Sequence, residues 1–127
     1  MTIKKNAFFN CKALAYITFN EALETIEGYA FYANESIVTL DLPASVKSIG
    51  KSAFQGCNQM RSILLRESVE TIGAHAFYGC TALTIYTNAT KKLSGWDAYW
   101  NSSYKGVVFG CVLSEDGTYV ESVTLTA

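Results

Sequence analysis

The chain has 127 residues, half of them hydrophobic, and 10 Lys plus Arg against 11 Asp plus Glu give a formal net charge of -1. This length and composition are sufficient for one domain with a continuous hydrophobic core. The sequence has no basic cluster, which argues against nucleic acid or an acidic membrane surface as the main partner.

The N-terminal stretch opens directly on a repeated unit at Ile3. No apolar run reaches the roughly 18 to 20 residues that span a bilayer, and Met1–Lys5 lacks the apolar segment of a secretion signal. A stack of repeats usually has a polar capping unit at its end. We therefore expect that Met1 marks a boundary within a longer protein, preceded by further repeats or a cap. The uncovered first unit also allows self-association through Met1–Phe19, because an unpaired strand edge pairs readily with another chain.

From Ile3 to Leu83 the sequence repeats with a constant 23-residue period and without an insertion. The most regular columns contain alanine (Ala7, Ala30, Ala53 and Ala76), phenylalanine (Phe8, Phe31, Phe54 and Phe77) and a small residue (Cys11, Asn34, Cys57 and Cys80). A fixed period of this length indicates a solenoid, in which each 23-residue coil buries its apolar side only against neighbouring coils. The phenylalanine column is the predicted structural spine.

Each coil is predicted to contain two extended segments and one tight turn. Apolar residues alternate with polar ones at Leu40–Leu42, which is the period of a half-buried strand. A second short strand is expected around Val46–Ile49. The helical spacing that follows is interrupted by Gly50 and Gly56, so we expect only a tight helical turn at Ala53–Gln55.

The sequence LDLPASVKSIGKSAFQGC, at Leu40–Cys57, resembles the unit of the BspA-like family of bacterial leucine-rich repeat proteins, roughly LxxIxLPxxVxxIGxxAFxxC. The other coils are similar over about residues 3–83, with departures such as Glu27 at a glycine position and Asn34 at the cysteine position. The resemblance implies a leucine-rich repeat solenoid of the α/β type, a right-handed superhelix. It is expected to be mostly β, with short helical or 3₁₀ turns on the convex side and a parallel sheet on the concave side. The resemblance also implies a bacterial cell-surface or secreted protein with a role in adhesion.

The regular register ends after Leu83. Leu83–Thr87 looks one residue shorter than the equivalent stretch of the preceding coil. If so, Ile85 and Thr87 point inward and Tyr86 points outward; without the deletion, Tyr86 would lie in the core. We prefer the shortened alignment, because isoleucine is the better core residue.

The predicted organisation is therefore four repeats at residues 1–88 and a C-terminal cap at residues 89–127. The segment Ser94–Asn101 resembles the sequence that closes the last repeat in the family, and its aromatic residues are expected to lie over the last coil. A β-hairpin is predicted from Gly106–Leu113 and Thr118–Leu125, which flank an Asp-Gly turn.

Two alternatives are open for Trp96, Tyr99 and Trp100. They form either the packing surface of the cap or a platform that stacks against sugars. We prefer the cap, because the last coil needs a cover and no feature of the sequence requires a ligand.

The sequence suggests no metal, cofactor or catalytic residue. Cys57 and Cys80 occupy equal positions in adjacent coils, so their side chains point the same way, and we predict buried thiols rather than a disulfide. The four cysteines lack the CxxC spacing of zinc sites. His75 is the only histidine, and no feature supplies it with a nucleophile or an orienting carboxylate. It is predicted to be an exposed loop residue.

The candidate binding face consists of the side chains that alternate with the inward ones on the predicted sheet. Its residues are Tyr16, Thr18, Asn20, Thr39, Asp41, Ser62, Leu64, Arg66 and Tyr86. Tyrosine, arginine and an exposed leucine suit a protein contact, although the same pattern also describes an ordinary solvated sheet. We hypothesise a non-catalytic module that binds a protein or another macromolecule. A structural spacer is the second hypothesis, and an enzyme is the third.

Overall fold

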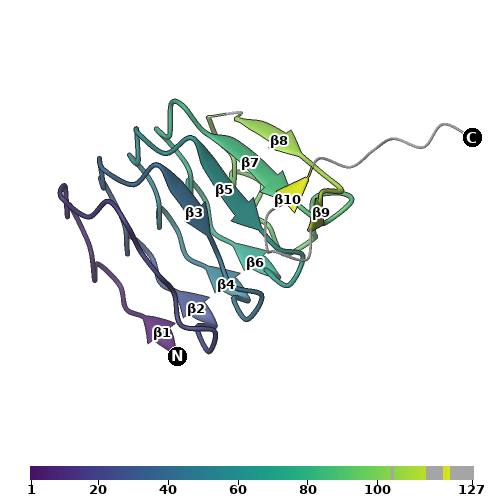
Figure 1. Ribbon diagram of the computed structural model, residues 1–127, viewed down its shortest axis with the longest axis horizontal. Coiled ribbons are helices and arrows are strands. Elements are labelled where there is room, and N and C mark those ends of the chain that lie inside the picture. Colours follow the sequence, from purple (N-terminus) through teal and green to yellow (C-terminus); the bar gives the residue numbers. More distant parts are fainter. Residues whose placement is uncertain (104, 114–118, 121–127) are drawn as a thin grey trace, which may run out of the picture.

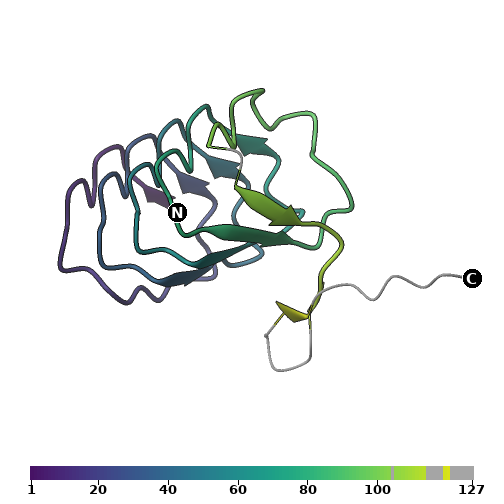
Figure 2. The ribbon, with the colours of Figure 1, turned by 90° about the horizontal axis from the view of Figure 1, so that it is seen from above.

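The computed structural model describes residues 1–103, 105–113 and 119–120, and its chain winds into a parallel-strand solenoid of about five turns (Figure 1). One four-stranded sheet has the order β1 (Thr2–Ile3), β2 (Thr25–Ile26), β4 (Ser48–Ile49) and β6 (Thr71–Ile72). The other has the order β3 (Thr39–Asp41), β5 (Ser62–Leu65), β7 (Thr84–Thr87) and β8 (Gly106–Val108). Successive coils lie side by side in both views (Figure 2).

The strand register follows the repeat of the sequence. Ile3 pairs with Ile26, Ile26 with Ile49, and Ile49 with Ile72, all in parallel. The predicted second strand around Val46–Ile49 is confirmed as β4. Residues at the same position of successive repeats therefore lie next to each other along the stack, as the 23-residue period predicts.

The shortened register after Leu83 is confirmed. Ile63 pairs with Ile85 and Leu65 with Thr87, and both pairs are one residue closer in the sequence than the pairs between earlier coils. Ile85 and Thr87 are buried, whereas Tyr86 is half-buried. The deletion keeps isoleucine in the core row.

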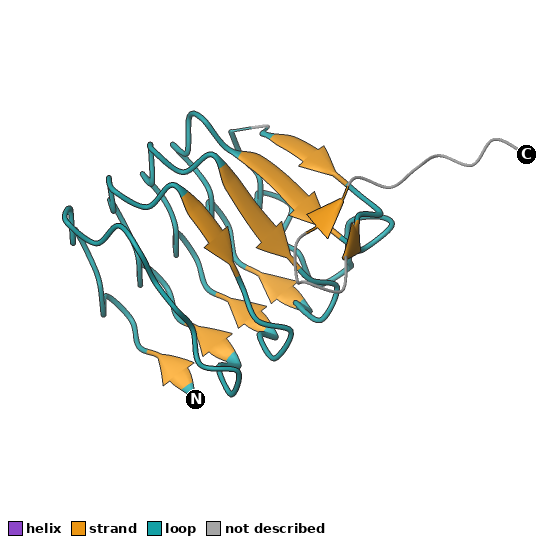
Figure 3. Ribbon diagram, viewed as in Figure 1, coloured by secondary structure: helices purple, strands orange, loops and turns teal. Residues whose placement is uncertain are grey.

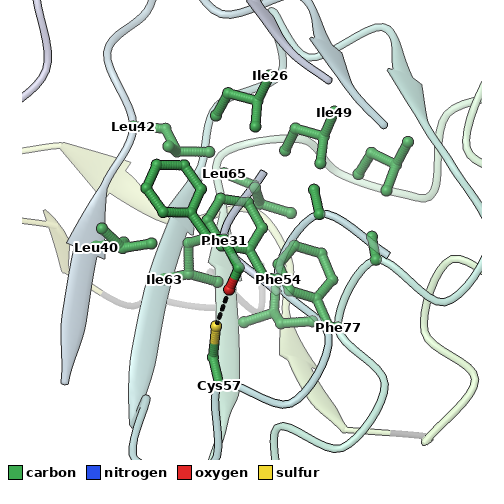
Figure 4. Packing of buried hydrophobic residues seen from close by; sticks show 14 of the residues in the cluster. Ile26, Phe31, Leu40, Leu42, Ile49, Phe54, Cys57, Ile63, Leu65 and Phe77 are labelled. Carbon is green, nitrogen blue, oxygen red and sulfur yellow. Dashed lines mark hydrogen bonds between the residues drawn. The ribbon is translucent and has the colours of Figure 1, made fainter. Parts of the chain in front are cut away.

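The core is a column of stacked phenylalanine rings (Figure 4). The centroid distance is 5.2 Å for Phe8 and Phe31, 5.3 Å for Phe31 and Phe54, and 5.7 Å for Phe54 and Phe77. The rings of Phe31, Phe54 and Phe77 are buried. Phe8, at the N-terminal end of the column, is 37% exposed. Ile26, Ile49, Leu42 and Leu65 pack around the column in the same cluster.

The described residues contain no helix (Figure 3), so the predicted helical turns are not confirmed. No helix long and apolar enough to cross a membrane occurs in this part of the chain. In the turn that follows β4, the N–H groups alternate between two kinds of acceptor. Those of Ala53 and Gln55 bond to carbonyls three residues earlier, whereas those of Ser52, Phe54 and Gly56 donate to the next coil. An α-helix would use every N–H internally, so the bonds between coils replace it.

This alternation places two residues of each coil in the left-handed backbone region. Their φ angles lie between 56° and 80° at Asn6, Tyr29, Ser52 and His75, and at Asn10, Ala33, Gly56 and Gly79. Most of these residues are not glycine, and a left-handed φ costs an L-residue about 1 to 2 kcal/mol. The hydrogen bonds between coils hold the backbone in this conformation.

The aromatic segment packs against the fourth coil. Trp96 and Trp100 are buried in the core cluster, and Trp96 Nε1 donates to the Val69 carbonyl over 2.8 Å. The segment also continues the solenoid, because Trp96 forms a parallel bridge with Ile72.

The hairpin prediction is only partly right. Gly106–Val108 is not a hairpin arm but strand β8, which pairs in parallel with β7. The antiparallel pair consists of β9 (Val112–Leu113) and β10 (Tyr119–Val120). The predicted Asp-Gly turn and residues 121–125 lie outside the described residues.

Candidate binding face

The open face is the outward surface of the sheet that contains β3, together with the stretch of the first coil that precedes it. The structure leaves five of the predicted residues exposed: Tyr16, Thr18, Asn20, Thr39 and Asp41. Ser62, Arg66 and Tyr86 are half-buried, and Leu64 is buried. Most of the exposed area therefore lies at the N-terminal half of the face.

Strand pairing brings these side chains into rows. Asp41 pairs with Leu64, and Leu64 with Tyr86. Thr39 pairs in the same way with Ser62. The rows follow directly from the parallel register, because paired residues of adjacent strands lie about 4.8 Å apart on the same face of the sheet.

Leu64 contradicts the sequence prediction of an exposed leucine, because only 1% of it is accessible. It lies on the inner strand β5, between Asp41 on one side and the large ring of Tyr86 on the other. Residues of an inner strand are screened on both sides, whereas the alternation pattern reports only which face a side chain occupies. Leu64 is therefore not an available contact residue.

The first coil does not extend the sheet. No backbone hydrogen bond in the described part of the chain joins residues 15–19 to β3. Two neighbouring depressions, of about 660 and 560 Å³, lie along this boundary and share Ile17, Thr18 and Asp41. The larger also reaches Glu21 and Arg66, and the smaller reaches Tyr16 and Val38. Together they form one groove across the exposed half of the open face.

Arg66 has a fixed position at this groove. Its Nε donates to the Leu42 carbonyl over 3.1 Å, and its Nη2 lies 3.4 Å from Asp41 Oδ1. The guanidinium thus links two adjacent coils and places a positive charge beside a carboxylate. Such an arrangement offers both a donor and an acceptor to a ligand.

Val38 is a groove residue that the sequence prediction missed. It is 45% exposed. Ala15 and Arg61 hold the equivalent positions of the neighbouring coils, which shows that this column is not part of the core. A valine at a repeat position that is not part of the core is the sequence signal that would have identified Val38 as a surface residue.

His75 is not the exposed loop residue that the sequence predicts. It is half-buried in the turn that follows β6, and its Nδ1 lies 2.8 Å from Ser102 Oγ. Its ring stacks on Tyr99 at a centroid distance of 6.1 Å and meets Tyr78 edge-on. These contacts attach the fourth coil to the segment that follows it.

The cysteines connect neighbouring coils through weak hydrogen bonds. Cys57 and Cys80 are buried as predicted. The Cys57 thiol donates to the Phe31 carbonyl over 3.3 Å (Figure 4), and the Cys80 thiol donates to the Phe54 carbonyl over 3.1 Å. Cys11, Cys57 and Cys80 are free thiols. The adjacent Cys80 thiol and burial both raise the pKa of Cys57 far above its ordinary value. The described residues contain no group of three or more His, Cys, Asp or Glu able to hold a metal ion.

The parallel sheets and the 23-residue register define a leucine-rich repeat solenoid. A family model described as the BspA type leucine rich repeat region matches residues 1–105 in six copies. The chain belongs to this BspA-type leucine-rich repeat family. Searches of curated proteins and of solved structures returned no significant match.

Proposed function

We propose that this chain is a non-catalytic binding module that engages another protein through the groove of the open face. The observation that carries the proposal is the exposure of Tyr16, a residue that is 93% accessible at the edge of this groove. A tyrosine so exposed adds little to the stability of the folded core. It offers a large and rigid contact surface to a partner.

The composition of the groove favours a protein partner. Tyr16 and Val38 supply apolar area, and the linked pair of Asp41 and Arg66 supplies a donor and an acceptor. Protein contacts combine an apolar centre with such polar groups. The family resemblance supports a cell-surface or secreted bacterial location and a role in adhesion, which we include in the proposal.

Burial of the two tryptophans argues against the carbohydrate alternative. Both Trp96 and Trp100 lie in the hydrophobic core cluster, and neither presents a ring to a sugar. Tyr99 alone of the three aromatic residues is exposed.

The test compares a binding module with a structural spacer. Partners are captured by crosslinking on cells that express the full-length protein and are identified by mass spectrometry. Each partner is then purified and titrated against this chain. The triple variant Tyr16→Ala, Asp41→Ala and Arg66→Ala should weaken saturable binding by about tenfold or more, because contacts of this kind dominate protein interfaces. The control is Tyr78→Ala, which removes a ring that is 49% exposed on a turn outside the groove. It should leave the affinity unchanged.

Circular dichroism of each variant shows whether it remains folded. A spacer would show no saturable binding by the wild-type chain. Equal affinities of the wild-type chain and the folded triple variant would also refute the proposal.

A further inference from the structure

The edge of β3 that faces residues 15–19 has open backbone groups. In a parallel pair of strands, every second residue of a strand bonds to the same neighbour. The Val38 carbonyl accepts a hydrogen bond over 2.7 Å from Arg61, which directly precedes β5. Thr39 and Asp41 therefore direct their backbone groups to the opposite side of β3. No backbone hydrogen bond joins them to residues 15–19 in the described part of the chain. Open N–H and C=O groups of this kind can pair with an added strand.

The groove of the open face follows the same edge. Its two depressions share Ile17 and Thr18 on one wall and Asp41 on the other, and the smaller one also reaches Val38 and Thr39. Val38 precedes Asp41 by three residues, which corresponds to about 10 Å along an extended chain. One extended segment of a partner can therefore contact the side chains of Val38 and Asp41 and the open backbone groups between them.

The accessible charge in the groove is negative. Glu21 lines the larger depression, is exposed and takes part in no ion pair in the described part of the chain. The Asp41 side chain is 60% exposed. The Arg66 side chain is only 19% exposed, because the Leu42 carbonyl and Asp41 already hold its guanidinium. The two carboxylates are thus more accessible to a partner than the guanidinium, and this difference favours a cationic group in the groove.

The surroundings of these carboxylates suit a long basic side chain. Pro43 and Ala44 line the larger depression beside Glu21 and Asp41. Lysine and arginine lay their methylene stems on apolar surface of this kind while the charged end stays in water. An acidic segment would instead bring its carboxylates beside two others, with no free guanidinium to receive them.

Building on the proposed function, we propose that the partner enters the groove as an extended, positively charged segment. Its backbone pairs with the open groups of Thr39 and Asp41. A lysine or arginine of the segment lies at Glu21 and Asp41, and an apolar side chain contacts Val38. The sheet edge thus supplies affinity through backbone hydrogen bonds, and the carboxylates select the sequence.

The test uses peptides as probes. Random linear peptides displayed on phage are selected on the wild-type chain, and clones that also bind the triple variant Tyr16→Ala, Asp41→Ala and Arg66→Ala are discarded. The selected sequences should contain more lysine and arginine than the unselected library. The most enriched peptide is synthesised and titrated against the wild-type chain and its variants.

One charge and its matched control test the electrostatic part. Glu21→Gln should weaken peptide binding by about threefold or more and reduce its dependence on salt. Glu70→Gln removes an exposed carboxylate outside the groove and should leave the affinity unchanged. Selected sequences without an excess of basic residues, or equal affinities for the wild-type chain and Glu21→Gln, would overturn the proposal.

Backbone methylation tests the strand pairing. Two versions of the peptide carry N-methyl groups on alternate residues, so that each version loses the N–H donors of one edge of the extended chain. One version should bind at least about tenfold more weakly than the parent peptide, and the other should bind as the parent does. Equal effects of the two methylation patterns would exclude pairing with β3.

A purified protein partner separates this inference from the proposed function. If the partner binds the wild-type chain and loses affinity for the triple variant, but the peptide does not displace it, the groove is a binding site and the inference about an extended segment is wrong. Absence of saturable binding by any protein or peptide would refute both. Concentration-dependent sedimentation of the wild-type chain that the triple variant lacks would assign the groove to a second copy and would also refute the inference.

Discussion

The ring of Trp100 lies 6.3 Å from the ring of Phe77, and the two planes are 86° apart. Trp100 follows Phe77 by one full repeat period and thus occupies the phenylalanine column of the next turn. Within the column, the planes of Phe31, Phe54 and Phe77 differ by only 1° to 2°. An edge-to-face contact is favourable for aromatic rings. The parallel column therefore ends at Trp100, which covers its last member.

The stacked column predicts a gradient of stability effects. Phe54→Ala removes a buried ring with neighbours on both sides and should lower the free energy of unfolding by about 3 to 5 kcal/mol. Phe8→Ala should cost clearly less, because that ring is partly exposed. Urea unfolding measures both variants. Equal losses would show that the rings do not form one continuous column.

The hydrogen bond of Trp96 predicts a second effect on stability. Trp96→Phe keeps an aromatic ring but leaves the Val69 carbonyl without its donor. This loss should cost about 1 to 3 kcal/mol. The control Tyr99→Phe changes an exposed side chain and should stay within about 0.5 kcal/mol of the wild-type chain. Thermal unfolding of both variants checks this expectation, and a neutral Trp96→Phe substitution would contradict the burial of that bond.

Alanine and glycine substitutions at one left-handed turn position of the repeat should have opposite effects on stability. Ala33 has a positive φ in the left-handed region. Ala33→Gly should stabilise the chain by about 0.5 to 1 kcal/mol, because relief of strain exceeds the entropy cost of glycine. Gly56→Ala should destabilise it, since φ there is also positive and the new Cβ would lie 3.3 Å from Ala33 Cα. Chemical denaturation is the measurement, and a destabilising Ala33→Gly substitution would refute the assigned backbone conformation.

The raised pKa of Cys57 predicts a loss of stability at alkaline pH. The folded state keeps this thiol neutral, whereas the unfolded thiol ionises near the ordinary value of 9.0. The neutral Cys57 thiol therefore makes its full contribution to the free energy of unfolding below pH 9.0. Above that pH the contribution falls by about 1.4 kcal/mol for each pH unit. Urea unfolding at pH 7, 9 and 10 should show a smaller alkaline loss for Cys57→Ala than for the wild-type chain. Identical pH profiles would count against a buried neutral thiol.

Much of the fold follows from the sequence, because identical residues that recur every 23 positions come to lie on one another in successive coils. The phenylalanine column, the register of Ile49 on Ile26, and the one-residue deletion before Ile85 were all predictable from spacing and side-chain size. Strand β8 was missed, although a signal existed. The shortened spacing that separates Ile63 from Ile85 also separates Ile85 from Val107.

The turns and the open face were less predictable. The left-handed backbone at Tyr29 and Ala33 arises from hydrogen bonds to the next coil, which propensity alone does not reveal. Burial of Leu64 depends on neighbours across two strands, and the half-buried position of His75 depends on Tyr99 and Ser102 far along the chain. Alternation of polar and apolar residues assigns a face, but it does not report what lies across that face.

Hydrogen exchange of the chain with and without a purified candidate protein partner tests the proposed binding through the groove most directly. A partner that occupies the groove should slow the exchange of amides at residues 15–21 and 36–45 in the complex, because these stretches form its walls. Amides in the turns at residues 52–56 and 75–79 should exchange as in the free chain. Protection confined to those turns, with residues 15–21 and 36–45 unchanged, would contradict binding through the open face.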